Sequence, residues 1–332
     1  MIVAKVIRSE GFASALRRAQ ERIGEGAEHL REMLTPLPRT SILNVAANPT
    51  SARFGGVGIQ LMARLRVERT LRDVALVDLA RLREGLAVTG AKAIHIEGTS
   101  GLRADEILRL IDEGIAVIVS MHDFSLKNRE LLRRAKGVIF PSRFLANEYD
   151  GGEVIEPSSG GQALTPVLHG KNVAFAGALH HHKGAHLLPD IARAVETLHI
   201  FGGAGDHDLV RAVRKITNVA FHGYYRAGTL PSLLARYRIG VVVIPSIVPE
   251  AFSLVISEAW LAGASVVAFD LGAQAERIRD HGGGLIAPLA SGATGLAERI
   301  APAMELRIPA VIATATDAAR AHCDLYRRWR LL

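Results

Sequence analysis

The sequence predicts an α/β protein with two doubly wound parallel sheets, and two observations carry this prediction. Short apolar runs alternate with helical patterns along most of the chain, an order typical of parallel sheets with helices on both faces. A segment at 150–170, rich in glycine, serine and proline, interrupts that order and predicts a linker between two such series. A length of 332 residues is sufficient for two domains of ordinary size.

Residues 1–40 are predicted to form a separate N-terminal extension. Their apolar side chains recur at spacings of three and four residues from Phe12 to Leu34, which predicts an amphipathic helix. The prolines that follow end it. We expect its apolar stripe to pack on its own domain. Docking on a membrane surface is the alternative, but the glutamates of this segment nearly cancel its basic charge.

The first sheet domain is expected over residues 41–165. Its predicted strands are short apolar runs at 41–46, 74–77, 93–96, 116–119 and 137–140. A glycine-rich turn at 54–58 follows the first strand and opens a helix predicted over 59–66.

The second domain is expected over residues 166–310 and repeats this order. Its predicted strands lie at 171–177, 198–202, 219–223, 240–245 and 265–269. A last helix is predicted at about 312–330.

The formal net charge of +7 is compatible with nucleic acid, an anionic membrane face or a phosphate-bearing substrate. The basic residues are scattered, without zinc-finger spacing or an aromatic-rich RNA-binding strand pair, so nucleic acid is the least supported partner. No window reaches about 18 consecutive apolar residues, which argues against a membrane span. The first residues are too short an apolar run for a signal peptide. The single cysteine, Cys323, cannot form an internal disulfide, so a cytoplasmic location is expected.

Two glutamates of the second domain, Glu250 and Glu258, stand eight positions apart. Glu250 follows the predicted strand at 240–245, and Glu258 lies about two helical turns later. Both side chains can therefore face the carboxyl edge of a parallel sheet, where open α/β folds bind ligands. The free N–H groups between them, near Phe252 and Ser253, open a helix and suit an anionic phosphate.

The segment around these glutamates resembles the E-x7-E signature of retaining GT-B glycosyltransferases of family 4, also called group 1. Residues 249–254, 257–259 and 268–278 follow the family pattern in order. They are similar to bacterial transferases that build cell-surface polysaccharide such as O-antigen. The resemblance spans about 41–290 and implies two Rossmann-like domains facing a central cleft. It also implies that the C-terminal helix, 311–332, returns to the first domain.

The resemblance implies a site for a nucleotide-diphosphate sugar, the donor, on the second domain. Glu258 would accept hydrogen bonds from the ribose hydroxyls, and Glu250 would face the transferred sugar as the catalytic carboxylate. Lys183 would offset the charge of the diphosphate. The other donor-binding positions that match the family are Gly56, Phe252, Ser253, Leu254 and Gly272.

One position departs from the family, which carries an arginine where this chain has Ala178. A phosphate-binding cation is therefore missing, and His180, His182 or a basic residue from elsewhere is the expected substitute. The histidines at 180–182 are adjacent, and consecutive side chains do not converge on one ion. No metal and no cofactor are expected.

Two residues of the first domain also match family positions. His122 follows the strand at 116–119, and the resemblance implies that it is a catalytic residue near the donor sugar and the acceptor. A structural histidine is the alternative. Ser142 matches a position that lines the cleft, and a helix N-cap is its alternative. The sequence Asp206-His207-Asp208 mimics a metal-binding motif but is expected to cap a helix.

The predicted function is a retaining, metal-independent glycosyltransferase that moves a sugar from a nucleotide-diphosphate donor to a saccharide or lipid-linked acceptor. The setting that the resemblance implies is cell-surface polysaccharide synthesis in the cytoplasm, compatible with peripheral contact to the inner membrane face. Two alternatives stay open. One is a degenerate GT-B protein that binds a nucleotide sugar without catalysis, which Ala178 supports. The other is a GT-B sugar-nucleotide epimerase.

Overall fold

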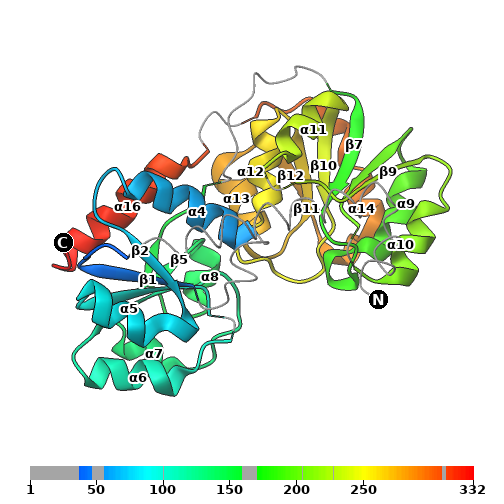
Figure 1. Cartoon of the computed structure of the whole chain (residues 1–332). Helices are drawn as coiled ribbons and strands as arrows, with labels where there is room; N and C mark the ends of the chain where they lie inside the picture. Colours follow the sequence, from blue (N-terminus) through cyan, green and yellow to red (C-terminus); the bar gives the residue numbers. More distant parts are fainter. Residues whose placement is uncertain are drawn as a thin grey trace. The chain divides into compact units, whose positions relative to one another are not determined.

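The computed structural model describes residues 37–46, 56–99, 101–158, 170–203, 205–226, 228–308 and 312–332 (Figure 1). The predicted N-terminal helix and the start of the glycine-rich turn at 54–58 lie outside the described residues. The described residues divide into two compact units. The N-terminal unit takes in residues 37–158 and 313–332, and the C-terminal unit takes in residues 170–312.

The N-terminal unit contains a six-stranded parallel sheet in the order β2-β1-β3-β4-β5-β6. Its strands are β1 (Ile42–Ala46), β2 (Ala75–Asp78), β3 (Ala93–Glu97), β4 (Ala116–Ser120), β5 (Gly137–Phe140) and β6 (Glu153–Val154). Its helices are α4 (Gly56–Glu68), η1 (Leu79–Arg81), α5 (Leu82–Thr89), α6 (Ala104–Asp112), α7 (Arg129–Arg134), α8 (Arg143–Asn147) and α16 (Ala315–Arg328). Helices alternate with strands, as the apolar pattern predicts.

The C-terminal helix α16 belongs to the N-terminal unit and packs along α4. It begins with a capping box, in which the side chains of Thr314 and Asp317 each accept from the other's backbone N–H. At its other end Trp329 lies against Gly137, the first residue of β5. A Cβ at Gly137 would stand 2.3 Å from the indole ring, so glycine is required for this close approach.

The C-terminal unit contains a second six-stranded parallel sheet, in the order β12-β11-β10-β7-β8-β9. Its strands are β7 (Asn172–Ala176), β8 (Leu198–Phe201), β9 (Val219–Gly223), β10 (Ile239–Ile244), β11 (Ser265–Phe269) and β12 (Gly284–Ala287). Its helices are η2 (His181–Lys183), η3 (Ala185–Leu187), α9 (Leu188–Arg193), α10 (His207–Arg214), α11 (Leu230–Arg236), α12 (Leu254–Leu261), α13 (Gly272–His281), η4 (Leu289–Ser291), α14 (Gly292–Ala297) and α15 (Ile300–Met304). No helix in the described parts of either unit is long and apolar enough to cross a membrane.

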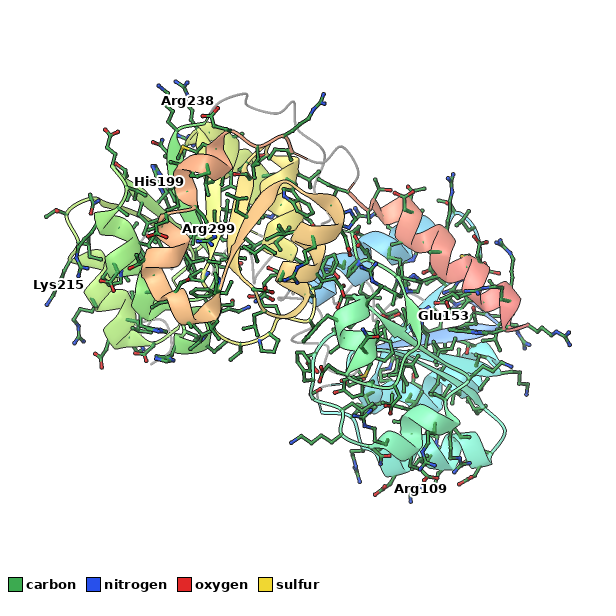
Figure 2. The ribbon with its side chains drawn as sticks, turned by 180° about the vertical axis from the view of Figure 1, so that it is seen from behind. Arg109, Glu153, His199, Lys215, Arg238 and Arg299 are labelled. Carbon is green, nitrogen blue, oxygen red and sulfur yellow. The ribbon has the colours of Figure 1, made fainter. Side chains whose placement is uncertain are left out.

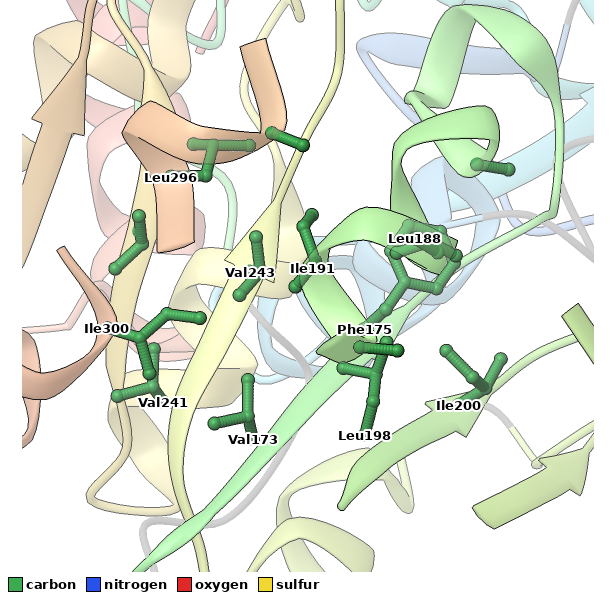
Figure 3. Packing of buried hydrophobic residues seen from close by; sticks show 14 of the residues in the cluster. Val173, Phe175, Leu188, Ile191, Leu198, Ile200, Val241, Val243, Leu296 and Ile300 are labelled. Atoms are coloured by element: carbon green, nitrogen blue, oxygen red, sulfur yellow. The ribbon is translucent and has the colours of Figure 1, made fainter. Parts of the chain in front are cut away.

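The core of the C-terminal unit follows from the two-residue period of its strands. Val173 and Phe175 of β7 join one buried cluster, shown in Figure 3, together with residues of α9, α14 and α15. Ala174 and Ala176 join the cluster on the opposite face. Because both faces are covered by helices, successive residues of a strand are all buried, and the strands read as continuous apolar runs.

The structure adds two strands that the sequence pattern did not predict. β6 has two residues and lies inside the predicted linker at 150–170, too short to give a period-two signal. β12 contains only three apolar residues after a glycine run, but it extends the sheet beyond β11. The last helix begins at Ala315 rather than near 312, because Thr314 caps it.

Candidate functional site

The two signature glutamates lie after β10, at the carboxyl edge of the C-terminal sheet. β10 ends at Ile244, and Glu250 lies in the loop that leads to α12. Glu258 lies on α12 itself, in its second turn. This edge of a parallel sheet is where open α/β folds bind ligands, so the expected position of both residues agrees with the topology.

Glu250 is held by a basic and a hydroxyl side chain. Its Oε1 atom accepts a hydrogen bond from Lys183 Nζ at 2.8 Å and one from Ser246 Oγ at 2.5 Å. Only 12% of its side chain is exposed, whereas 36% of the Lys183 side chain is. Burial alone would raise the pKa of the Glu250 carboxyl, but the Lys183 ammonium and these hydrogen bonds lower it below its ordinary value. The site therefore holds an ionised carboxylate at neutral pH.

Glu258 has the opposite electrostatic character. Burial raises the pKa of its carboxyl to about 7. Among the described residues no hydrogen bond or ion pair reaches this carboxylate. Burial raises the pKa of the Tyr225 hydroxyl, and the nearby Glu258 carboxylate raises it further. An acceptor without a protein donor is suited to bind the hydroxyl groups of a ligand.

The loop that carries Lys183 is fixed against the end of β10. Lys183 ends η2, and Gly184 follows in the left-handed region with φ of 73°. A Cβ at Gly184 would stand 1.9 Å from the Pro245 carbonyl oxygen, so only glycine fits here. The Ile247 N–H also donates to the His182 carbonyl at 3.0 Å. This packing explains how Lys183 reaches Glu250 from a distant part of the chain.

The histidines near Lys183 are stacked on one another or on a neighbouring histidine. The rings of His180 and His182 stack with centroids 5.3 Å apart. Burial, Lys183 and His180 lower the pKa of His182, so this ring is neutral at pH 7 in the free protein. Among the described residues, no group of three or more His, Cys, Asp or Glu side chains is arranged to hold a metal ion. Asp206 is the N-cap of α10, where its side chain accepts from the Asp208 N–H, as expected.

Gly272 packs directly on the Glu250 loop. It begins α13 with φ of 60°, and a Cβ there would stand 2.8 Å from the Glu250 nitrogen and from the Pro249 Cα. The Ala273 N–H donates to the Glu250 carbonyl at 3.0 Å, and the Glu250 N–H donates to Gln274 Oε1 at 3.0 Å. The structure thus brings Gly272 together with Glu250 and Lys183.

The segment from Phe252 to Leu254 starts α12. Helix α12 begins at Leu254, and Ser253 precedes it with φ of 65° and ψ of 82°, a left-handed conformation that is rare for serine. Beneath this turn lies Arg277, a buried arginine of α13 that the sequence pattern did not single out. Its guanidinium lies 3.8 Å from the centroid of the Phe252 ring.

The predicted residues of the N-terminal unit lie at the carboxyl edge of its own sheet. His122 follows β4, and its Nε2 atom, 3.9 Å from Glu97 Oε2, has no hydrogen-bond partner among the described residues. Ser142 is the N-cap of α8 and accepts from the Leu145 N–H at 3.1 Å. Gly56 is the first residue of α4.

His122 borders a small cavity of about 40 Å³ that the sequence did not predict. Glu97 also lines this cavity, and so does Ser158, whose hydroxyl is buried without a partner among the described residues. Burial opposes ionisation of Glu97, but the buried Arg64 guanidinium holds the pKa of this carboxyl well below its ordinary value. A charged pair inside an apolar sheet edge leaves no hydropathy signal, which is why the sequence analysis missed it.

Comparison with known proteins defines the class of fold. Residues 170–306 match the family model described as glycosyl transferases group 1. No curated protein gives a significant match to the chain.

Solved structures match over most of the chain. HepE of Anabaena, in complex with UDP-glucose, has 21% identity and a TM-score of 0.59, over 88% of this chain and 96% of that one. A glycosyltransferase of Rickettsia africae has 14% identity and a TM-score of 0.63, over 88% and 99%. The lipopolysaccharide outer core galactosyltransferase WaaB, in its apo form, has 13% identity and a TM-score of 0.60, over 86% and 99%. The chain therefore has the two-domain GT-B fold of glycosyltransferases, which confirms the predicted fold class.

Proposed function

We propose that this protein is a retaining glycosyltransferase of family 4 that uses a nucleotide-diphosphate sugar. The observation that carries the proposal is the pairing of a buried, ionised Glu250 with a partly exposed Lys183 at the carboxyl edge of the C-terminal sheet. The family-model match over 170–306 covers this pair. HepE, which shares the fold, was solved with UDP-glucose, so that compound is the first donor to test.

The proposed roles follow from the chemistry of each side chain. Lys183 offsets the negative charge of the leaving diphosphate, together with the N–H groups that begin α12. Glu250 faces the transferred sugar and stabilises the positive charge that develops at its anomeric carbon as the bond to the diphosphate breaks. Glu258 accepts hydrogen bonds from the ribose hydroxyls. None of these roles requires a divalent cation or a cofactor.

The acceptor is proposed to be a saccharide or a lipid-linked saccharide used in cell-surface polysaccharide synthesis. His122 is proposed to act near the reacting sugar, with Gly56 near the donor and Ser142 lining the cleft. A cytoplasmic protein with peripheral contact to the inner membrane face would suit such an acceptor.

One experiment separates this proposal from its alternatives. The purified protein is incubated with UDP-glucose and with GDP- and ADP-linked sugars, and melting temperature and release of nucleoside diphosphate are measured. A ligand that binds only the native state raises the melting temperature. Binding with release of the nucleoside diphosphate supports a transferase. Binding without release favours the degenerate protein, which the methyl group at Ala178 supports. Conversion of the donor to an epimer identifies an epimerase.

A further inference from the structure

Residues of helix α13 form hydrogen bonds to the segment that connects the two signature glutamates, Glu250 and Glu258. Arg277 lies four positions after Ala273 and three after Gln274, so the side chain of Arg277 is a neighbour of both on the helix surface. Ala273 and Gln274 bind the backbone of Glu250, as described above. Arg277 binds the next part of the segment, where α12 starts.

Arg277 reaches three groups of this segment at once. Its Nη1 atom donates to the Ser253 carbonyl at 2.9 Å, and its Nη2 atom donates to Ser257 Oγ at 2.8 Å. The face of the guanidinium lies on the Phe252 ring. Arg277 is only 3% exposed, so these contacts form in a low-dielectric environment where they are strong.

The turn that Arg277 holds is strained. A serine in the left-handed region is disfavoured by contact between its Cβ and the backbone, and such residues persist where the surroundings impose them. The Ser253 carbonyl also accepts the Ile256 N–H at 3.2 Å, the first hydrogen bond of α12. The direction of the Ser253 carbonyl therefore sets where the free N–H groups of this helix point.

We propose that Arg277 is a positioning residue of the donor site, which holds the left-handed turn at Ser253 and so aligns the start of α12 with Glu250 and Lys183. This inference rests on the proposed function. Arginine is required because its planar fork donates in two directions while its face stacks on an aromatic ring. A lysine carries the same charge but cannot make these contacts together.

The test compares Arg277→Met with a matched control, Arg299→Met. Arg299, labelled in Figure 2, is a partly buried arginine of the same unit, and it donates to the carbonyls of Ile286 and Gly295. Amide hydrogen exchange over residues 252–258 is measured first, without ligand. UDP affinity, and kcat and KM for UDP-glucose, follow. A third variant, Arg277→Met with Ser253→Gly, is compared with Ser253→Gly alone and asks whether relief of the strain removes the need for Arg277.

We expect Arg277→Met to accelerate exchange at 252–258 by about tenfold and to weaken UDP binding by about tenfold, whereas Arg299→Met changes neither. The double variant should bind UDP about as well as Ser253→Gly alone, because glycine adopts a left-handed conformation freely and does not need Arg277 to hold it. Arg277→Lys, which keeps the charge, should resemble Arg277→Met and replaces it if the methionine variant does not fold.

Two outcomes overturn the inference. One is exchange at 252–258 in the Arg277 variants that equals that of the Arg299 control. The other is wild-type UDP affinity in Arg277→Lys, which would mean that Arg277 acts by charge alone. If UDP binds neither the wild-type protein nor any variant, the proposed donor fails, and the exchange data still decide the role of Arg277.

Discussion

Replacing Glu258 by glutamine should change how the stability of the protein depends on pH. The folded protein raises the pKa of this carboxyl from 4.5 to about 7 by burial. An acid with a raised pKa stabilises the fold fully below the unfolded value and loses that contribution as pH rises through the folded value. A difference of about 2.5 pH units at about 1.4 kcal/mol each gives about 3 kcal/mol in all. Between pH 5 and 8 we expect about 2–3 kcal/mol of this loss.

The assay is urea unfolding of the wild-type protein and of Glu258→Gln at pH 5, 6, 7 and 8. The glutamine variant should gain about 2–3 kcal/mol relative to the wild-type protein across this range, because it carries no charge to bury. The exposed Glu298 on the same unit supplies the control, as Glu298→Gln removes one charge without removing a buried group. A pH-independent difference between wild type and Glu258→Gln would refute the reasoning.

The same titration should appear in ligand binding. An ionised carboxylate accepts ribose hydroxyls better than a protonated one, so UDP affinity should rise as pH rises through about 7. UDP itself titrates, and subtraction of the Glu258→Gln profile removes that contribution. Glu258→Ala should weaken nucleoside diphosphate binding by about 1–3 kcal/mol. Unchanged binding in this folded variant would remove the ribose assignment.

Four further predictions concern the Glu250 side of the site. Glu250→Gln should lower turnover of UDP-glucose without weakening UDP binding, and a variant with wild-type turnover would contradict the catalytic role. Lys183→Met should destabilise the fold by about 1–2 kcal/mol at pH 7, because the Glu250 carboxylate loses its partner. The loss should be smaller at pH 4, where Glu250 is protonated in the variant. Equal urea midpoints at pH 7 would contradict the ion pair. Transfer should survive EDTA, and loss of activity restored by manganese would point to a metal. Ala178→Arg should leave UDP affinity nearly unchanged if another cation has taken over, whereas a tenfold gain would show that none has.

The alternation of apolar runs and helical patterns was sufficient to predict ten of the strands. A parallel strand that is buried on both faces is a continuous apolar run, and such a run is easily recognised in the sequence. It failed where an element is too short to be periodic, as at β6, which pairs with β5 over two residues. Residues 1–36 lie outside the described part of the chain, so the predicted amphipathic helix stays a prediction.

The positions of Glu250 and Glu258 at the carboxyl edge of one sheet were predictable, because both lie within nine residues of the chain after the same strand. The site was not predictable where the contact spans the fold. Gln274 and Arg277 reach the Glu250 loop from the next helix, and nothing in their own sequence indicates a partner more than 20 residues away. The conformation of Ser253 is also invisible in the sequence, since serine gives no signal for a left-handed turn.

The charges of the site bear on the choice between an enzyme and a degenerate binding protein. In the free protein Lys183 is engaged by Glu250, His182 is neutral, and Ala178 carries no charge. A bound diphosphate therefore competes with Glu250 for the Lys183 ammonium. In a transferase that competition is useful, because it leaves the Glu250 carboxylate less neutralised and able to stabilise the positive sugar. In a protein that only binds, the same competition weakens affinity without benefit. Glu250→Gln should thus strengthen UDP binding while it abolishes transfer, and weaker UDP binding in this variant would favour a structural role for the pair.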